Sequence, residues 1–146
     1  SARLEVHADV EPWVFVPTVR LATKKARGVL PAHVPHADAA FNAGRAALLV
    51  EALTRRPDLL FEATEDKLHQ DYRAEVMASS TELVRGLRSL GLPAVVSGAG
   101  PTVLVLGRAS EGDRVAQAVA ELLGDDGPFD VLTPGLDLVG ARGERL

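Results

Sequence analysis

The sequence predicts an α+β fold, a ferredoxin-like split β-α-β sandwich whose first crossover is enlarged into a cluster of helices. The expected elements follow the order strand, helices, strand, strand, helix, strand. The second and third strands along the chain are joined only by residues 98–101, which permits an antiparallel pair and excludes a parallel crossover. The chain has 146 residues, of which 47% are hydrophobic and 25% charged, so it can form one ordinary hydrophobic core.

The first strand is expected over residues 12–21, where prolines flank β-branched and aromatic side chains. Residues 22–29 have helix-forming composition, with Thr23 as the expected N-cap. A longer helix is expected over residues 38–55, because apolar side chains recur there at helical spacing until Pro57 ends the run.

Two further helical segments are expected over residues 59–65, with Asp58 as N-cap, and over residues 66–77. In the second segment, one face is expected to carry side chains four residues apart, namely Leu68, Tyr72 and Val76. Ser79 and Glu82 have the spacing of a capping box, which predicts that another helix begins there.

The helix that starts at Ser79 is expected to bury Leu83, Leu87 and Leu90 and to end at Gly91, in a left-handed conformation. The remaining elements are two strands, a helix with Val115, Val119 and Leu122 on one face, and a last extended segment. Their expected ranges are 94–97, 102–107, 113–123, and 129–133 with 136–140.

Composition and charge exclude several classes of protein. The net charge of −4 disfavours nucleic-acid binding through a broad basic face, and no apolar run approaches the ~20 residues of a membrane span. The chain has no cysteine, which rules out disulfides and thiolate chemistry. We therefore expect a cytoplasmic protein that binds neither nucleic acid nor a membrane, and we find no secretory signal in the opening residues.

The glycine-rich stretch Ser97-Gly98-Ala99-Gly100-Pro101 is the most unusual feature of the sequence. Its glycines uncover backbone N–H groups and permit positive φ, which is how loops approach phosphates. A tight turn between strands is the simpler interpretation. The stretch is neither a dinucleotide fingerprint nor a Walker loop, because a strand rather than a helix follows it.

Arg27 and Arg73 are the other candidates, because a pair of guanidinium groups can bind a carboxylate in bidentate fashion. With 13 arginines in the chain, surface positions are the simpler interpretation for both. The histidines and acidic residues, such as those between Asp66 and Asp71, lack the spacing of a metal site. We expect no metal ligand and no Ser/His/Asp catalytic set.

Four segments together resemble the homoserine kinase family. Thr23-Lys-Lys-Ala-Arg27-Gly-Val-Leu-Pro31 resembles its "T-x-x-A-R-x-x-L-P" segment, and Asp38-Ala-Ala-Phe-Asn42 resembles its next helix. Glu65-Asp-Lys-Leu-His69-Gln-Asp-Tyr-Arg73 resembles its "D-x-x-H-x-x-Y-R" segment. Residues 97–102 resemble the third glycine motif of the wider superfamily of galactokinase, homoserine kinase, mevalonate kinase and phosphomevalonate kinase.

The resemblance implies ATP-dependent phosphorylation of the side-chain hydroxyl of L-homoserine, in threonine biosynthesis. It implies that Arg27 and Arg73 hold the substrate carboxylate with Thr23 beside them, and that residues 97–101 support the phosphate-binding loop. Family members often form homodimers, so a homodimer is a further expectation.

Nothing in the sequence matches the family's main phosphate loop, "P-x-x-x-G-L-G-S-S-A". We therefore expect residues 1–146 to be the C-terminal domain of such a kinase, with no catalytic residue of its own and with ATP and Mg²⁺ bound mainly by an N-terminal domain. Two alternatives stay open: another small-molecule kinase of the superfamily, or a free-standing ferredoxin-like module that binds an amino acid and regulates a partner.

Overall fold

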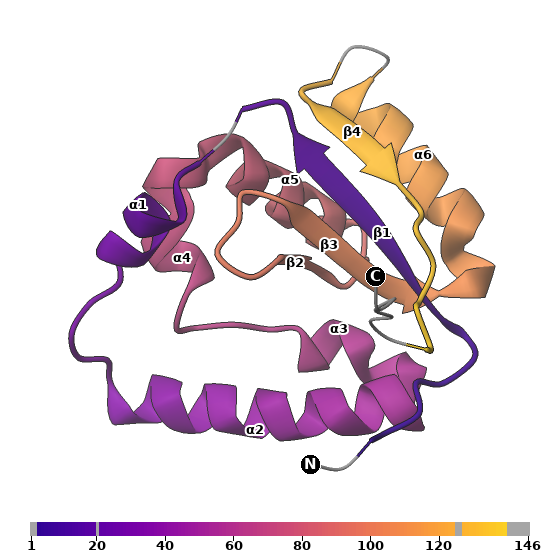
Figure 1. Cartoon of the computed structure of the whole chain (residues 1–146), viewed down its shortest axis with the longest axis horizontal. Coiled ribbons are helices and arrows are strands. Elements are labelled where there is room, and N and C mark those ends of the chain that lie inside the picture. Colours follow the sequence, from indigo (N-terminus) through magenta and orange to yellow (C-terminus); the bar gives the residue numbers. More distant parts are fainter. Residues whose placement is uncertain (1–2, 20, 125–126, 140–146) are drawn as a thin grey trace, which may run out of the picture.

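A computed structural model describes residues 3–19, 21–124 and 127–139. The chain forms one four-stranded sheet. Figure 1 shows the helices around this sheet, with the longest of them along the lower edge of the view. The strands are β1 (Val10–Pro17), β2 (Ala94–Val96), β3 (Val103–Arg108) and β4 (Phe129–Leu132). The α-helices are α1 (Thr23–Gly28), α2 (His36–Thr54), α3 (Leu60–Ala63), α4 (Gln70–Arg73), α5 (Ala78–Ser89) and α6 (Gly112–Leu123). The 3₁₀ helices are η1 (Pro57–Leu59), η2 (Ala74–Met77) and η3 (Ala109–Glu111).

The sheet has the strand order β2-β3-β1-β4, and every neighbouring pair is antiparallel. Trp13 of β1 is paired with Val105 of β3, and Val95 of β2 with Leu104. This order, with α5 and α6 as the two crossover helices, is that of a ferredoxin-like sandwich. The predicted fold class is confirmed, including the antiparallel pair on either side of the glycine-rich stretch.

The main hydrophobic core lies between one face of the sheet and helices α5 and α6. Phe15, Val103 and Val105 are fully buried on the sheet side, and Leu87 of α5 and Val115 of α6 cover them. These positions alternate along each strand, as expected for a sheet with one face against helices. The prediction that Leu83 and Leu87 would face the core is confirmed, and Leu90 packs at its margin.

A second, smaller core lies where α2 and α3 meet the start of β1. It consists of Val10, Ala52, Leu60 and Ala63, with partly buried leucines of α2 around them. Ala52 is the one fully buried residue among the 19 of α2. The long helix is therefore held to the domain mainly through its C-terminal half, and Figure 1 shows it running along one edge of the molecule.

The single helix predicted over residues 66–77 is wrong. Residues 66–69 are not helical, and only the short helices α4 and η2 follow. The side chain of Asp66 accepts the backbone N–H groups of Leu68, His69 and Gln70, which replaces the helical bonds there.

The buried residues of this region are not the three that share one face of the predicted helix. Tyr72 is 37% exposed and Val76 half-buried, whereas Arg73, Met77 and Ser80 are buried. The hydropathy pattern missed this face because two of its members, Arg73 and Ser80, are polar.

Three predicted N-caps are also wrong. Thr23 is the first residue of α1, and Ser79 lies inside α5, where neither side chain caps a helix. Asp58 lies inside η1 and pairs with Arg56 instead. The predicted left-handed residue at Gly91 is confirmed, with φ of 75°. The predicted extended segment 136–140 is not a strand over residues 136–139, and residue 140, like residue 20 of the first predicted strand, lies outside the described residues.

Candidate functional site

The glycine-rich loop, residues 97–101, leaves two backbone donors free. The N–H of Ser97 donates to Thr102 O at 2.8 Å, and that of Gly100 donates to Ser97 O at 2.9 Å. The N–H groups of Gly98 and Ala99 donate no hydrogen bond to any described residue. The loop is therefore a tight turn, as the simpler interpretation held, and it also presents two unpaired amides of the kind that bind anions.

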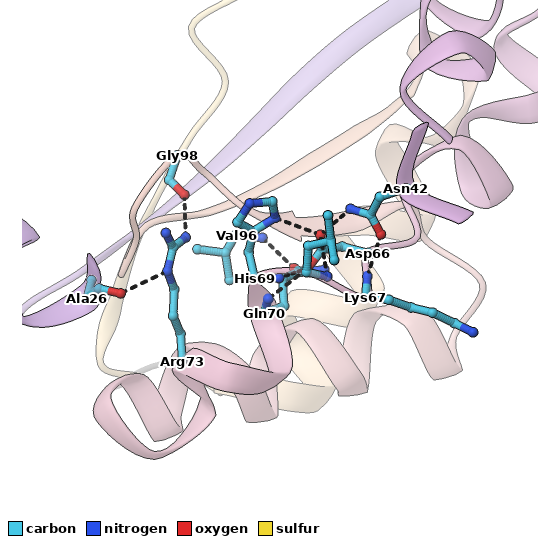
Figure 2. Close-up of polar contacts among 10 residues, drawn as sticks. Ala26, Asn42, Asp66, Lys67, His69, Gln70, Arg73, Val96 and Gly98 are labelled. Atoms are coloured by element: carbon cyan, nitrogen blue, oxygen red, sulfur yellow. Dashed lines mark hydrogen bonds and ion pairs between the residues drawn. The ribbon is translucent and has the colours of Figure 1, made fainter. Parts of the chain in front are cut away.

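Three side chains from one stretch of the chain hold the backbone on both sides of this loop. Gln70 Oε1 accepts the N–H of Val96 at 2.8 Å, and Arg73 Nη1 donates to Gly98 O at 3.0 Å, as Figure 2 shows. Ser80 donates to Pro101 O. Hydrogen bonds from α4 and α5 therefore fix the loop conformation, in addition to the strands that the loop joins.

Gly100 is closely packed against the same support. Its φ is 77°, and a Cβ atom there would lie 2.8 Å from Met77 Cε and 2.9 Å from Val96 Cγ1. Gly98 also has positive φ, 59°, but a Cβ there would meet open space. Gly100 is thus required for packing and conformation, whereas Gly98 is required for conformation alone.

Arg73 joins this loop to α1. Its side chain is only 6% exposed, and besides its bond to Gly98 it donates from Nε to Ala26 O at 3.1 Å. No described carboxylate pairs with it, so backbone carbonyls compensate for the burial of its charge. Its Nη2 donates to none of the described residues and is available to a ligand.

Arg27 directly follows Ala26, whose carbonyl oxygen accepts the bond from Arg73. Helix α1 therefore places Arg27 close to Arg73 in the chain's fold. Arg27 is exposed, and within the described parts of the chain its guanidinium has no hydrogen bond or ion pair. Thr23, also exposed, lies one helical turn before it. The structure therefore brings α1 with Thr23 and Arg27, the buried Arg73 and the glycine-rich loop together.

A polar network beside Arg73 was not recognised as a site in the sequence. The Asp66 carboxylate accepts Asn42 Nδ2 at 2.7 Å and His69 Nδ1 at 2.8 Å, as well as three backbone N–H groups. Burial alone would raise the pKa of Asp66, but hydrogen bonds from Gln70 N–H, the His69 ring and the Asn42 amide outweigh it and lower the pKa to about 2. An Asp shortly before a helical segment often accepts the first backbone N–H groups of that segment. Asp66 stands in that position, and this signal could have identified its role.

A cavity of about 230 Å³ lies beside these groups. It extends between α2, residues 63–73 and β2 with the start of the glycine-rich loop, and His69, Arg73 and Gly98 all line it. A larger hollow of about 580 Å³ lies between residues 3–6 and 137–139, and no candidate site residue lines it. The cavity at Arg73 has the size for a small polar molecule.

In the described residues, no group of three or more His, Asp or Glu side chains is arranged to hold a metal ion. Nor does any helix of the described chain combine the length and apolar character needed to cross a membrane.

Comparison with known proteins identifies the family. A family model described as "GHMP kinases C terminal" matches residues 39–125, which include most of α2, the Asp66 network, Arg73 and the glycine-rich loop. The chain belongs to the GHMP kinase C-terminal family. The resemblance found in the motifs is confirmed at this level.

Curated relatives of this GHMP kinase C-terminal domain carry the name homoserine kinase. The protein of Streptomyces avermitilis is 59% identical over 83% of this chain, and that of Streptomyces coelicolor is 56% identical over 97% of it. The chain spans only 40% and 44% of the lengths of those two proteins.

A crystal structure of homoserine kinase from Cytophaga hutchinsonii has a similar fold. It matches 90% of this GHMP kinase C-terminal domain with a TM-score of 0.73, at 22% sequence identity, and the match covers 43% of that protein. At this identity the likeness supports the fold and not the substrate.

Proposed function

We propose that this chain is the substrate-binding C-terminal domain of a homoserine kinase, which transfers the γ-phosphoryl group of ATP to the side-chain hydroxyl of L-homoserine. The proposal includes an N-terminal domain that precedes this chain, and we call the protein with both domains the complete kinase. We place it in the cytoplasm, as a step of threonine biosynthesis, and expect a homodimer.

The observation that carries the proposal is the position of Arg73. One buried guanidinium is bonded to Ala26 O on one side and to Gly98 O on the other, so it couples α1 to the loop with free amides. A kinase for an amino acid must hold a carboxylate close to the transferred phosphate, and a guanidinium bonded to a loop with two free amides supports such a role. Identity of 56–59% to proteins named homoserine kinase supports the same substrate.

The substrate carboxylate is held, in this proposal, by Arg27 and by the free Nη2 of Arg73, with Thr23 beside them. Arg27 has no competing partner among the described residues, so it can form the bidentate pair. Arg73 is rigid because two of its N–H groups are already bonded, which lowers the entropy lost on binding.

The amides of Gly98 and Ala99 face the phosphates, and Ser97, Gly100 and Pro101 maintain the loop. Two free N–H groups fit an anionic group, but the described residues offer no set of acidic ligands for Mg²⁺. ATP supplies the phosphoryl group and Mg²⁺ neutralises its charge. The N-terminal domain would bind most of both, so phosphoryl transfer requires both domains.

A chimera tests this function with the chain as it exists. The 146 residues would replace the matching C-terminal part of the Streptomyces coelicolor homoserine kinase, and ATP-dependent phosphorylation would be measured on L-homoserine, mevalonate and galactose. We expect turnover of homoserine alone. Activity on mevalonate or galactose instead would assign another kinase of the family. Binding of homoserine by the separate chain, together with an inactive chimera, would indicate a regulatory module.

In the active chimera, Arg73→Ala should raise the homoserine KM strongly and leave the ATP KM nearly unchanged. An unchanged homoserine KM would remove Arg73 from the substrate site.

A further inference from the structure

We propose that Asn42 of α2 is a positioning residue, which sets Arg73 and the glycine-rich loop in place through its bonds to Asp66 and Lys67. This inference rests on the proposed function for its kinetic consequences only. Nothing in the motif assignments or the comparisons gives Asn42 a role.

The Asn42 side chain uses both ends of its amide. Nδ2 donates to Asp66 Oδ1 at 2.7 Å, and Oδ1 accepts the N–H of Lys67 at 2.8 Å, as Figure 2 shows. An amide carries a donor and an acceptor on separate atoms, so it can donate to the carboxylate of Asp66 and accept from the following peptide at the same time. The pair of bonds fixes both the side chain of Asp66 and the backbone next to it.

Asp66 connects Asn42 to the first residue of α4. Its Oδ2 accepts the N–H of Gln70 at 2.7 Å, which orients the first residue of α4. Gln70 then bonds the N–H of Val96 at the entrance to the loop, and Arg73, one turn later, bonds Gly98 O. The path from α2 to the loop is therefore a continuous series of hydrogen bonds.

The two ends of helix α4 are held by different elements. Its C-terminal end continues through η2 into α5, which packs in the main core. Its N-terminal end follows the non-helical residues 66–69, and Asn42 of α2 bonds to the first two of these. Helix α2 has 19 residues and is anchored by Ala52 in the second core, so it can fix the N-terminal end of α4.

A second contact keeps α2 against the same segment. Phe41, the neighbour of Asn42, has the Arg45 guanidinium 4.6 Å and the Lys67 ammonium 4.5 Å from its ring centroid. Arg45 also pairs with Glu65 at 2.6 Å. These contacts hold α2 near residues 65–67. The bond from Asn42 is the one that connects α2 to the Asp66 carboxylate, whose other bonds in the described chain all come from residues 68–70.

Loss of the Asn42 amide tests the proposal in the complete kinase. Asn42→Asp places two carboxylates together, and Asn42→Leu removes both the donor to Asp66 and the acceptor for the N–H of Lys67, so each single variant breaks the bond to Asp66. We expect each single variant to raise the homoserine KM about tenfold, with kcat changed less than about threefold, and to speed hydrogen exchange at the amides of Gln70 and Val96.

Glu111→Gln is the matched control, because Glu111 accepts the N–H of Arg108 at the opposite end of β3. It should alter neither the homoserine KM nor exchange at Val96. If a single variant does not fold, Asn42→Ala, at a helical position that favours alanine, takes its place and should raise the KM similarly.

The proposal is overturned if the folded single variants behave like Glu111→Gln in the homoserine KM and in hydrogen exchange. Failure of the proposed function gives a different result. In that case the wild-type kinase would not phosphorylate homoserine, while hydrogen exchange at Val96 would still report whether Asn42 positions the loop.

Discussion

The guanidinium of Arg73 lies 3.0 Å from the carbonyl oxygen of Gly98, measured from Nη1, and this bond joins the two candidate motifs of the sequence. The same side chain holds Ala26 O, so α1, α4 and the loop are connected through one buried cation. A movement of the loop is therefore coupled to the group proposed to bind the substrate.

Loss of Arg73 should destabilise the chain as well as the site. Arg73→Ala removes two hydrogen bonds and leaves the carbonyls of Ala26 and Gly98 without their donor, so we expect the free energy of unfolding to fall by about 2–4 kcal/mol. Arg27→Ala, at an exposed residue without partners among the described ones, should change it by less than about 0.5 kcal/mol. Urea unfolding of the two variants makes the comparison, and equal midpoints would contradict it.

The two glycines of the loop should differ in their tolerance of alanine. Gly98→Ala introduces only the strain of positive φ, so we expect a loss of about 1 kcal/mol. Gly100→Ala adds overlap with Met77 and Val96, so we expect about 2–4 kcal/mol. Thermal or urea unfolding measures both. A Gly98→Ala variant as unstable as Gly100→Ala would show that the packing around Gly100 is not the deciding factor.

Asp66 should contribute a recognisable pH dependence. Its folded pKa of about 2 lies below the ordinary 3.8, so its contribution is present above pH 4 and is lost as the pH falls towards 2. Allowing for solvent screening, we expect about 1–2 kcal/mol from this group. In Asp66→Asn, the free energy of unfolding should therefore depend less on pH between pH 4 and 2. The measurement is made at high salt, which screens exposed ion pairs such as Glu51 with Arg55. A variant with an unchanged profile would exclude this role.

The separate chain should not catalyse phosphoryl transfer. In the proposed division of roles, this chain contributes two loop amides to the phosphates, whereas the N-terminal domain binds most of the ATP and Mg²⁺ that stabilise the transferred charge. Incubation with ATP, Mg²⁺ and homoserine, followed by detection of phosphohomoserine, should give no product above the rate without protein. Product formation at a rate comparable to the active chimera would show that the proposed division between domains is wrong.

The strands and the larger helices could be predicted because their signals are local. β-Branched and aromatic residues between prolines indicated β1, and the stripe through Leu83 and Leu87 indicated α5. The four-residue link expected between β2 and β3 permitted only an antiparallel pair. None of these features depends on contacts between distant residues.

The region around α4 could not be predicted in the same way, because polar side chains determine it. Asp66 ends the helical pattern by accepting backbone N–H groups, and Arg73 is buried through bonds to carbonyls of residues 26 and 98. Hydropathy gives no indication that an arginine will be buried. The motif resemblance selected Arg73, but it did not indicate that Arg73 also supports the loop.

The central claim is that Arg27 and Arg73 hold the carboxylate of homoserine in the complete kinase. Its most direct test is the ratio of kcat/KM for L-homoserine to kcat/KM for 2-aminobutane-1,4-diol, in which CH₂OH replaces the carboxylate. We expect a large ratio in the wild type and a fall of at least about tenfold in Arg27→Ala, because a charge-assisted bidentate pair contributes that much or more. A ratio that is the same in Arg27→Ala as in the wild type would contradict the claim.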